Sequence, residues 1–351
     1  MSKRILVINS GSTSLKYKVF DFESLKLIQE NKFSSIDNHR QAIKNALREI
    51  EEIVNITVIG HRVVHGGKDF RETTLINEDI IRKLANYNEL APLHNPFSLE
   101  AIKACLEFLP NVPNIAVFDT AFFKDLPQRV LVYPLPYEYY QKYGIQKFGF
   151  HGISHQYAAE EAAKKLKKDI KKLKLITCHL GGGASITAIK NGQPIDTSMG
   201  FTPLEGLMMM TRPGDLDPGV ILKIFELLPL GSGLKEVEDL LNFQSGIKGI
   251  SGCNNFLELL REVTFGNQRA KLALEIFIYR IKKYIGAYYA VLNGCDALVF
   301  TGEIGAGKPE TREKICQDFS LLKGVKIFSI PPNEELQIAR EVKKFLLERK
   351  E

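Results

Sequence analysis

Residues 4–22, RILVINSGSTSLKYKVFDF, and residues 173–196, LKLITCHLGGGASITAIKNGQPID, share one layout. Each begins with an apolar run, passes through a turn of small polar residues and glycine, and continues as a segment in which apolar and polar residues alternate. This pattern predicts a β-hairpin in both places. Because the two copies open the two halves of the chain, we expect two duplicated α/β domains.

The turns of the two hairpins are suited to phosphate. Backbone N–H groups exposed near Gly11, and near Gly181 to Ser185 in the second copy, can line a concavity that accepts phosphate oxygens. One such turn is most often only a turn. Two facing turns would hold a polyphosphate from both sides, so the phosphate interpretation depends on the duplication.

The composition fits a soluble two-domain protein. The 351 residues exceed the ~250 to 300 at which single hydrophobic cores stop growing. The hydrophobic content of 44% and the charged content of 25% are ordinary for such proteins. Much of the net charge of +6 lies in residues 162–175, where apolar residues at helical spacing and the lack of aromatic residues favour a solvated amphipathic helix over a nucleic-acid surface.

The compartment is inferred from the cysteines and from the apolar runs. The five cysteines lie far apart and form no CxxC pair, which favours a reducing environment. The N-terminal apolar run of four residues is too short for a signal-peptide core, and no later run approaches the length of a membrane span. We therefore expect a cytoplasmic protein that binds neither membrane nor nucleic acid.

The stretch from Asp196 to Gly219, DTSMGFTPLEGLMMMTRPGDLDPG, follows neither a strand nor a helix period, because glycine and proline recur through it. Irregular segments of this length inside compact domains are usually functional. Arg212 lies at its centre, between an apolar run and the acidic residues Asp215 and Asp217. The loop either leaves Arg212 in solvent or carries it to an anion. The two phosphate-type hairpins favour the anion.

Polar residues also end two apolar runs in the first half. Residues 53–67, IVNITVIGHRVVHGG, predict a strand that ends near Arg62, and residues 114–123 predict a buried strand with Asp119 at its polar end. Acids at such strand ends are frequent site residues in open α/β sheets. Residues 146–155, QKFGFHGISH, bring His151 to a helix start that Ser154 is expected to cap.

Further elements complete the second half. We expect helices near residues 219–229, 235–242 and 267–292, with the glycine-rich residues 245–252 as a connection. Residues 295–313 predict a strand, a glycine-rich turn and a helix start. Pro309 stands where a P-loop needs Ser or Thr, which excludes that motif. The last helix should begin near Glu334.

Taken together, these segments resemble the acetate and butyrate kinase family of the actin-like phosphotransferase superfamily. The resemblance is carried by VINSGSTSLK (7–16), GHRVVHGG (60–67), FDTAF (118–122), FGFHGISH (148–155), HLGGGAS (179–185), the stretch 196–219, SGIKGISG (245–252) and PNEELQIARE (332–341). These motifs follow one another over nearly the whole chain.

The resemblance implies two actin-like, ribonuclease H-like α/β domains around a central cleft. One would comprise residues 1–120 with the returning C-terminal helix 336–351, and the other residues 121–335, with an adenosine turn and dimer contacts. It also implies a homodimer that transfers the γ-phosphoryl group of ATP to acetate, with Mg²⁺ or Mn²⁺, and so forms acetyl phosphate and ADP reversibly.

Site residues follow from the family pattern, position by position. The residues implied in catalysis are Arg62, Asp119, His151 and Arg212. Those implied in binding the acid are Arg62, Val64, Leu93, His94, Phe150 and Pro203. Those implied near the nucleotide are Asn9, Ser12, Ser14, Lys16, His179, Gly181, Gly182, Gly183, Gly302 and Gly305. Those implied at the metal are Asn9 and Glu334.

The implied roles agree with the chemistry of in-line phosphoryl transfer, which depends on positioning and charge stabilisation. Arg62 and Arg212 would hold the carboxylate and the migrating phosphoryl group, because guanidinium groups match its equatorial oxygens. His151 would donate a hydrogen bond to that group. Asp119 would orient an arginine or the metal shell, and Glu334 would support magnesium.

The sequence also departs from the family pattern. Gly182 replaces the asparagine of HLGNGAS, residues 301–307 read TGEIGAG in place of TGGIGEN, and Phe123 and Pro213 are unusual. The chain is shorter than typical members, chiefly between Lys16 and Val58. These departures leave open another phosphoryl donor or a non-catalytic nucleotide-binding protein, although the complete set of charged site residues argues against the latter. A preference for propionate or butyrate is a further alternative. Val64 would narrow the acid pocket and so favours acetate.

Overall fold

The computed structural model describes residues 3–92, 94–229 and 233–349. The chain divides into two compact units. The first comprises Met1–Lys124, Phe150–Tyr157 and Asn333–Glu351, and the second comprises Asp125–Gly149 and Ala158–Pro332. The short segment that carries His151 therefore packs with the first unit.

The first unit is built on a mixed sheet with the strand order β3-β2-β1-β4-β6-β5. β1 pairs antiparallel with β2 and parallel with β4, which in turn lies parallel to β6. The strands are β1 (Arg4–Ser10), β2 (Ser14–Asp21), β3 (Leu27–Ser34), β4 (Ile56–Val63), β5 (Thr74–Leu75) and β6 (Asn114–Phe118). The predicted first hairpin is thus confirmed.

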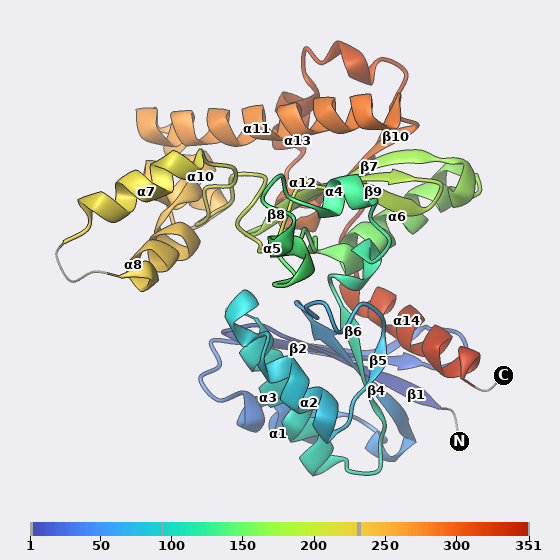
Figure 1. Cartoon of the computed structure of the whole chain (residues 1–351). Helices are drawn as coiled ribbons and strands as arrows, with labels where there is room; N and C mark the ends of the chain where they lie inside the picture. The colour runs from blue at the N-terminus through green and yellow to red at the C-terminus, as the bar shows by residue number, and fades with distance from the viewer. Residues whose placement is uncertain (1–2, 93, 230–232, 350–351) are drawn as a thin grey trace. The chain divides into compact units, whose positions relative to one another are not determined.

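Helices cover both faces of this sheet (Figure 1). On one face lie α1 (His39–Glu49) and α3 (Asn95–Phe108), and α2 (Glu78–Ala85) packs against α3. On the other face lies the C-terminal helix α14 (Glu334–Glu348).

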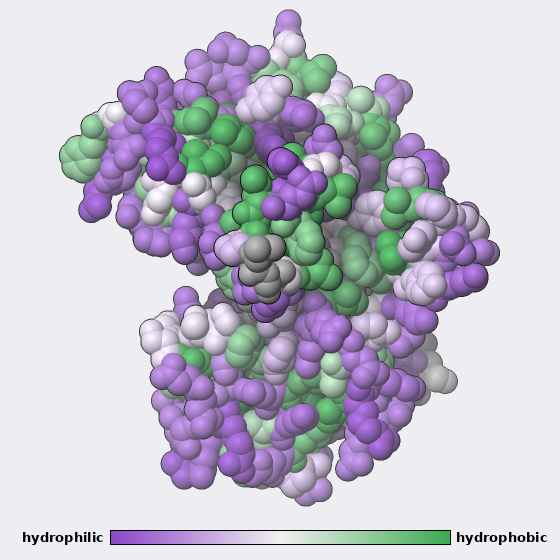
Figure 2. Space-filling view, turned by 60° about the vertical axis from the view of Figure 1, so that its left-hand side comes forward, coloured by the Kyte–Doolittle hydropathy of each residue, from purple (hydrophilic) through white to green (hydrophobic). Residues whose placement is uncertain are grey.

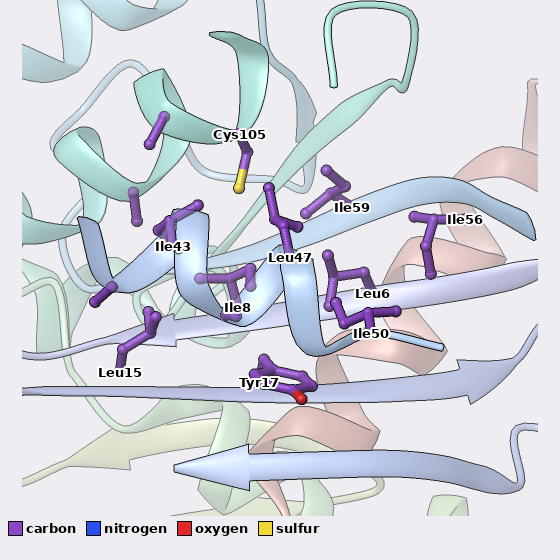
Figure 3. Close-up of a cluster of buried hydrophobic side chains, with 14 of the residues drawn as sticks. Leu6, Ile8, Leu15, Tyr17, Ile43, Leu47, Ile50, Ile56, Ile59 and Cys105 are labelled. Carbon is purple, nitrogen blue, oxygen red and sulfur yellow. The ribbon is translucent and has the colours of Figure 1, made fainter. Parts of the chain in front are cut away.

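Alternation along β1 explains the two layers. Leu6 and Ile8 belong to the cluster that faces α1 and α3, whereas the intervening side chains belong to the cluster formed with α14. Figure 3 shows Ile43 and Leu47 of α1 turned toward Leu6 and Ile8. Gly60 of β4 permits the close approach of α14, because a Cβ atom there would lie 2.8 Å from a methyl group of Val342.

The second unit repeats this plan. Its sheet has the order β11-β10-β7-β8-β9, so that β9, β8, β7, β10 and β11 correspond in order to β3, β2, β1, β4 and β6 of the first sheet. The directions also correspond, since β7 is antiparallel to β8 and parallel to β10. The strands are β7 (Lys174–Leu180), β8 (Ala184–Lys190), β9 (Gln193–Thr197), β10 (Ala297–Thr301) and β11 (Lys326–Ser329). The duplication predicted from the hairpins is confirmed.

The long helix α11 (Gln268–Leu292) packs on β7 and β8, in agreement with the predicted helix 267–292. α10 (Phe256–Thr264) and α13 (Pro309–Cys316) pack against it. The unit also contains α4 (Gln128–Leu131), α5 (Glu138–Gln141), α7 (Pro218–Leu227), α8 (Leu234–Asp239) and the part of α6 (Gly152–Leu166) that follows Tyr157. In the described part of the chain, no helix has both the length and the hydropathy needed to cross a bilayer.

Three local predictions differ from the structure, and one strand was not predicted. Residues 246–251 form the helix α9 (Gly246–Ser251), because the buried Ile247 holds the glycine-rich segment in place. The turn after β10 is the short helix α12 (Gly302–Gly307). Ser154 lies inside α6, which begins two residues earlier, so it is no cap. Strand β3 was not predicted, since it is a largely exposed edge strand without apolar alternation.

Candidate active site

Arg62 and Asp119 form a buried ion pair at neighbouring strand ends of the first unit. Arg62 is the penultimate residue of β4, and Asp119 follows β6, whose last residue pairs with Val63. The Nε and Nη2 atoms of Arg62 donate to Oδ2 of Asp119 at 3.1 and 2.7 Å. The Asp119 side chain is 1% exposed and the Arg62 side chain 19%. The sheet therefore brings together two of the residues predicted for catalysis.

The pKa shifts of this pair follow from burial and from a second carboxylate. Burial raises the pKa of Asp119, and the charge of Arg62 opposes that rise. Burial alone would lower the pKa of Arg62, but the carboxylates of Asp119 and Glu334 raise it above its usual value. Arg62 thus remains a cation at every pH of interest.

Asn9, Lys16 and two glutamates extend the pair. Nη1 of Arg62 lies 3.4 Å from Oδ1 of Asn9, at the end of β1, and 3.6 Å from Oε2 of Glu334. Asn9 donates through Nδ2 to Oε1 of Glu335 at 3.0 Å, and Lys16 forms an ion pair with Oε2 of Glu335 at 2.9 Å. The first turn of α14 therefore supplies two carboxylates to the polar network around Arg62.

Glu335 was not among the predicted site residues. Its side chain is 2% exposed, whereas that of Glu334 is 16% exposed. Burial would raise the pKa of Glu335, but Lys16, the hydrogen bond from Asn9 and Lys18 together lower it. The sequence does show two acids, Glu334 and Glu335, at the predicted start of the last helix. It does not show which of the two side chains points inward.

His151 is held in a strained backbone conformation beside Asp119. Its φ of +57° is left-handed, which costs a non-glycine residue about 1 kcal/mol or more. The next residue, Gly152, donates its N–H to the Asp119 carbonyl at 3.0 Å, and a Cβ atom on Gly152 would lie 2.1 Å from that oxygen. Gly152 thus lets the start of α6 approach the Asp119 backbone and fixes His151 near the ion pair. Strain of this kind persists mainly at functional sites.

Three of the segments predicted for the acid pocket lie together in the first unit. His65, which follows Val64, exchanges backbone hydrogen bonds with the Asn95 side chain, which follows His94, at 3.1 and 2.9 Å. The Phe150 ring packs edge-on against His65 with the ring centroids 5.2 Å apart. Val64 and Phe150 are buried. Leu93 lies outside the described residues.

Each phosphate-type hairpin is closed by a backbone hydrogen bond donated by the first glycine of its turn, although the two bonds span different numbers of residues. In the first unit Gly11 donates its N–H to the Ser14 carbonyl at 2.8 Å, and in the second unit Gly181 donates to the Gly183 carbonyl at 2.9 Å. Ser12 and Gly182, near the tips, are exposed. A Cβ atom at Gly182 would meet no other atom within 4 Å. His179 is the penultimate residue of β7, beside this turn.

Arg212 lies in the irregular loop of the second unit without an acidic partner. Its Nη1 donates to the Pro203 carbonyl at 3.0 Å, and no carboxylate of a described residue lies within ion-pair distance of it. Arg212 keeps some accessible surface, yet the protein packed around it lowers the pKa of its guanidinium to about 10 through desolvation. The loop also meets the hairpin, since Met210 donates its N–H to the Gly182 carbonyl at 3.2 Å. A cation with this much desolvation and no counter-charge is suited to an anionic ligand.

Pro213 has a structural environment that the sequence did not explain. It lines a cavity of about 280 Å³ in the second unit, together with Tyr133, Glu205 and Asp215. Lys147 forms an ion pair with Glu205, and Tyr284 donates to Asp215 at 2.7 Å. The two carboxylates of this cavity are therefore already partnered by the protein.

The predicted adenosine turn lies against the second hairpin. Gly302 has a φ of +81°, and a Cβ atom there would lie 2.4 Å from the Leu180 carbonyl oxygen. Arg312, which was not predicted, donates through Nη1 to the carbonyls of Gly305 and Ala306 at 2.9 and 2.8 Å. Arg312 therefore binds the carbonyl end of α12, where the family pattern has an acid and an amide.

The residues present fit a magnesium ion. Asp119 Oδ1 is buried without a hydrogen-bond partner, and Asn9 and Glu334 supply further oxygen donors near Arg62. Within the described residues there is no group of three or more His, Cys, Asp or Glu side chains that would hold a metal by themselves. Mg²⁺ is commonly bound by one or two carboxylates together with water and substrate phosphates, and this oxygen set meets that requirement.

Comparison with known proteins identifies the family. The Acetokinase family model matches residues 24–334. An acetate kinase of Halothermothrix orenii is 44% identical over 392 aligned positions, which cover 96% of this chain and 98% of the relative. These positions outnumber the 351 residues of the chain, so the relative carries residues that this chain lacks.

Solved structures agree. The crystal structure of Porphyromonas gingivalis acetate kinase has a TM-score of 0.89 and 35% identity, with 98% of this chain and 100% of that chain covered. A propionate kinase from Francisella tularensis has a TM-score of 0.87 and 36% identity, with 97% and 98% covered. The fold is therefore that of a kinase with duplicated actin-like domains. Within that class, the chain belongs to the Acetokinase family.

Proposed function

We propose that this protein is an acetate kinase that transfers the γ-phosphoryl group of ATP to acetate, reversibly, to give acetyl phosphate and ADP. The observation that carries the proposal is Arg212, a desolvated guanidinium that no carboxylate of the described chain partners, on a loop joined to a phosphate-type hairpin. Such a group supplies positive charge to a transferring phosphoryl group without reorganisation.

The first unit would supply the other half of the chemistry. Arg62 is fixed by Asp119, which orients its guanidinium for a carboxylate or phosphate oxygen. His151, fixed by Gly152, would donate a hydrogen bond to the same phosphoryl group. Asn9 and Glu334 would hold Mg²⁺ or Mn²⁺, which when bound to ATP neutralises part of the phosphate charge.

Acetate is the acid that we assign, and propionate or butyrate is the alternative. Val64 is 6% exposed and Phe150 is 1% exposed, so the space beside Arg62 is limited by fixed apolar side chains. The similarity to a propionate kinase, at 36% identity, supports propionate as an alternative substrate. One extra methylene changes binding by only about 1 to 3 kcal/mol, so a single pocket can accept both acids.

ATP is the donor that we assign. The altered turn, with Glu303 in the first turn of α12 and Arg312 on its last carbonyls, supports testing other nucleoside triphosphates and pyrophosphate as well. A non-catalytic nucleotide-binding protein is the least favoured candidate, because such a protein has no use for the strained His151 and the unpartnered charge of Arg212.

We also propose a homodimer. α7 has the sequence PGVILKIFEL and buries none of its residues. Leu222 is 69% exposed and Leu227 is 73% exposed, and Leu234 at the start of α8 is 80% exposed. Figure 2 turns the α7 side toward the viewer and shows hydrophobic residues, in green, at the surface among hydrophilic ones. A second subunit would cover this apolar surface.

The function is tested by an activity matrix. Acetate, propionate and butyrate are each combined with ATP, GTP and pyrophosphate, and the acyl phosphate is trapped with hydroxylamine as the hydroxamate. We expect the highest kcat/KM for acetate with ATP, and a loss of about 10²-fold or more in kcat for Arg212→Ala. Absence of hydroxamate with every acid and donor would refute the proposal, and a higher kcat/KM for propionate or butyrate would change the assigned substrate.

A further inference from the structure

The start of α9 forms backbone hydrogen bonds with the Arg212 loop, although the two segments lie more than thirty residues apart in the sequence. Ser245 donates its N–H to the Thr211 carbonyl at 3.0 Å, Ile247 donates to Met209 at 2.9 Å, and Lys248 donates to Met210 at 2.8 Å. Three consecutive carbonyls of the loop are thus bound by one short segment. These hydrogen bonds replace the regular pairing that the irregular loop lacks.

Gly246, the first residue of α9, is the point of closest approach. A Cβ atom there would lie 2.2 Å from the Met209 carbonyl oxygen, 2.6 Å from the Arg212 carbonyl oxygen and 2.9 Å from the Arg212 nitrogen. Its φ of +63° is left-handed. Glycine alone meets both conditions, because it has no Cβ and accepts positive φ.

The loop is closed on itself at the same place. Met209 donates its N–H to the Arg212 carbonyl at 2.9 Å. Thr211 donates its hydroxyl to the Asn242 carbonyl at 2.7 Å, in the π-helix η5 (Leu240–Gln244) that precedes α9. The backbone of residues 209–211, just before Arg212, is therefore fixed by the segment 242–248, and Gly246 lies against the backbone of Arg212 itself.

We propose that Gly246 is a positioning residue for Arg212: its lack of a side chain lets the start of α9 hold the loop in the one conformation that presents the guanidinium to the transferring phosphoryl group. This inference rests on the proposed function of Arg212. Among the described residues, the side chain of Arg212 has one hydrogen bond, to the Pro203 carbonyl, so its direction depends on the backbone at residues 209–212. A displacement of about 1 Å at such a group can cost about 10²-fold in rate.

The same helix offers a matched control. Gly252, at the other end of α9, also has a positive φ, of +80°, but a Cβ atom there would meet nothing within 4 Å. Gly246→Ala and Gly252→Ala therefore share the cost of a left-handed alanine and differ in the contact with the Arg212 backbone. We expect kcat to fall about 100-fold in Gly246→Ala, with the KM for ATP little changed, and to stay at the wild-type value in Gly252→Ala.

A double-mutant cycle separates positioning from general damage. If Gly246 acts through Arg212, Gly246→Ala should cause no further loss in an Arg212→Ala background. Thr211→Val, which removes only the bond to Asn242, is the milder variant if Gly246→Ala does not fold. It should lower kcat, and Thr211→Ser, which keeps the hydroxyl, should restore it.

The outcomes are distinct. Wild-type inactivity would refute the proposed function itself. An active wild type with equal kcat in Gly246→Ala and Gly252→Ala, or fully additive losses in the cycle, would refute the positioning role and leave the proposed function intact. If Gly246→Ala does not fold, wild-type kcat in Thr211→Val would refute it in the same way. A selective, non-additive loss, or a loss in Thr211→Val that Thr211→Ser restores, supports it.

Discussion

The guanidinium of Arg62 directs two of its donors, Nε at 3.1 Å and Nη2 at 2.7 Å, to a single oxygen of Asp119. The other carboxylate oxygen, Oδ1, is buried and has no hydrogen-bond partner among the described residues. Asp119 thus orients the arginine with one oxygen and keeps the second available. Both residues lie at the ends of adjacent parallel strands, so the sheet itself determines their separation.

Replacing Asp119 with alanine should destabilise the first unit as well as lower activity. Arg62 would keep its buried charge without its main partner, and breaking a buried pair from one side costs about 3 to 5 kcal/mol. Urea unfolding followed by circular dichroism measures the change. The control is Glu72→Ala, which removes a largely exposed partner of Lys124 and should cost less than about 1 kcal/mol. Equal losses in the two variants would contradict the buried pair.

His61 should make stability depend on pH. Burial lowers the pKa of His61 from 6.5 to about 4, against the hydrogen bond to Asn114, and its Nδ1 is buried without a partner. Between pH 6.5 and 4 the unfolded chain binds a proton that the folded chain does not. The free energy of unfolding should therefore fall by about 3 kcal/mol as pH is lowered through this window.

His61→Gln tests this assignment, because glutamine keeps a donor for Asn114 and does not titrate. Urea unfolding at pH 7, 5.5 and 4.5 should give a flatter profile for the variant than for the wild type, with the largest gain at the lowest pH. Identical pH profiles would show that another group dominates the acid sensitivity.

Much of the fold was predictable because its signals are local. The apolar runs and turns of the hairpins specify β1-β2 and β7-β8, and their repetition specifies the shared topology of the two sheets. The edge strand β3 was missed because it is largely exposed and only Gln29 and Phe33 are partly buried, so little apolar alternation is imposed on its sequence. α9 was missed because Gly246, its first residue, serves a contact with a distant loop, which no local pattern reveals.

The candidate site was predictable in its residue types and less so in their partners. The strand ends that carry Arg62 and Asp119 follow from the parallel sheet. The choice of Glu335 as the buried acid depends on how α14 is rotated against β1 and β2, which is a matter of packing. Arg312 was not recognised as a site residue. It lies in α13, the helix after α12, and its hydrogen bonds to two carbonyls of α12 become visible only in the structure.

Restoring the family asparagine at position 182 should strengthen nucleotide binding. Gly182 is exposed and a Cβ atom there would meet no atom within 4 Å, so a side chain can begin at this position without displacing a neighbour. The added amide can donate to a phosphate oxygen, and one hydrogen bond is worth about 1 kcal/mol, which is about fivefold in affinity. The KM for ATP in the hydroxamate assay measures the effect. Gly182→Ala is the control, and an equal change in both variants would assign the effect to the backbone.

The adenosine turn should tolerate a side chain at one of its glycines and not at another. Gly302→Ala places a Cβ atom 2.4 Å from the Leu180 carbonyl oxygen in a residue with a φ of +81°, which should cost about 2 to 4 kcal/mol of stability and raise the KM for ATP. Gly307→Ala meets nothing within 4 Å and should be neutral or stabilising by up to about 1 kcal/mol. Thermal unfolding and the ATP dependence of the rate check both variants. Wild-type stability and KM in Gly302→Ala would contradict this prediction. They would mean that the turn does not need its close contact with β7 and that Gly302 is not required for nucleotide binding.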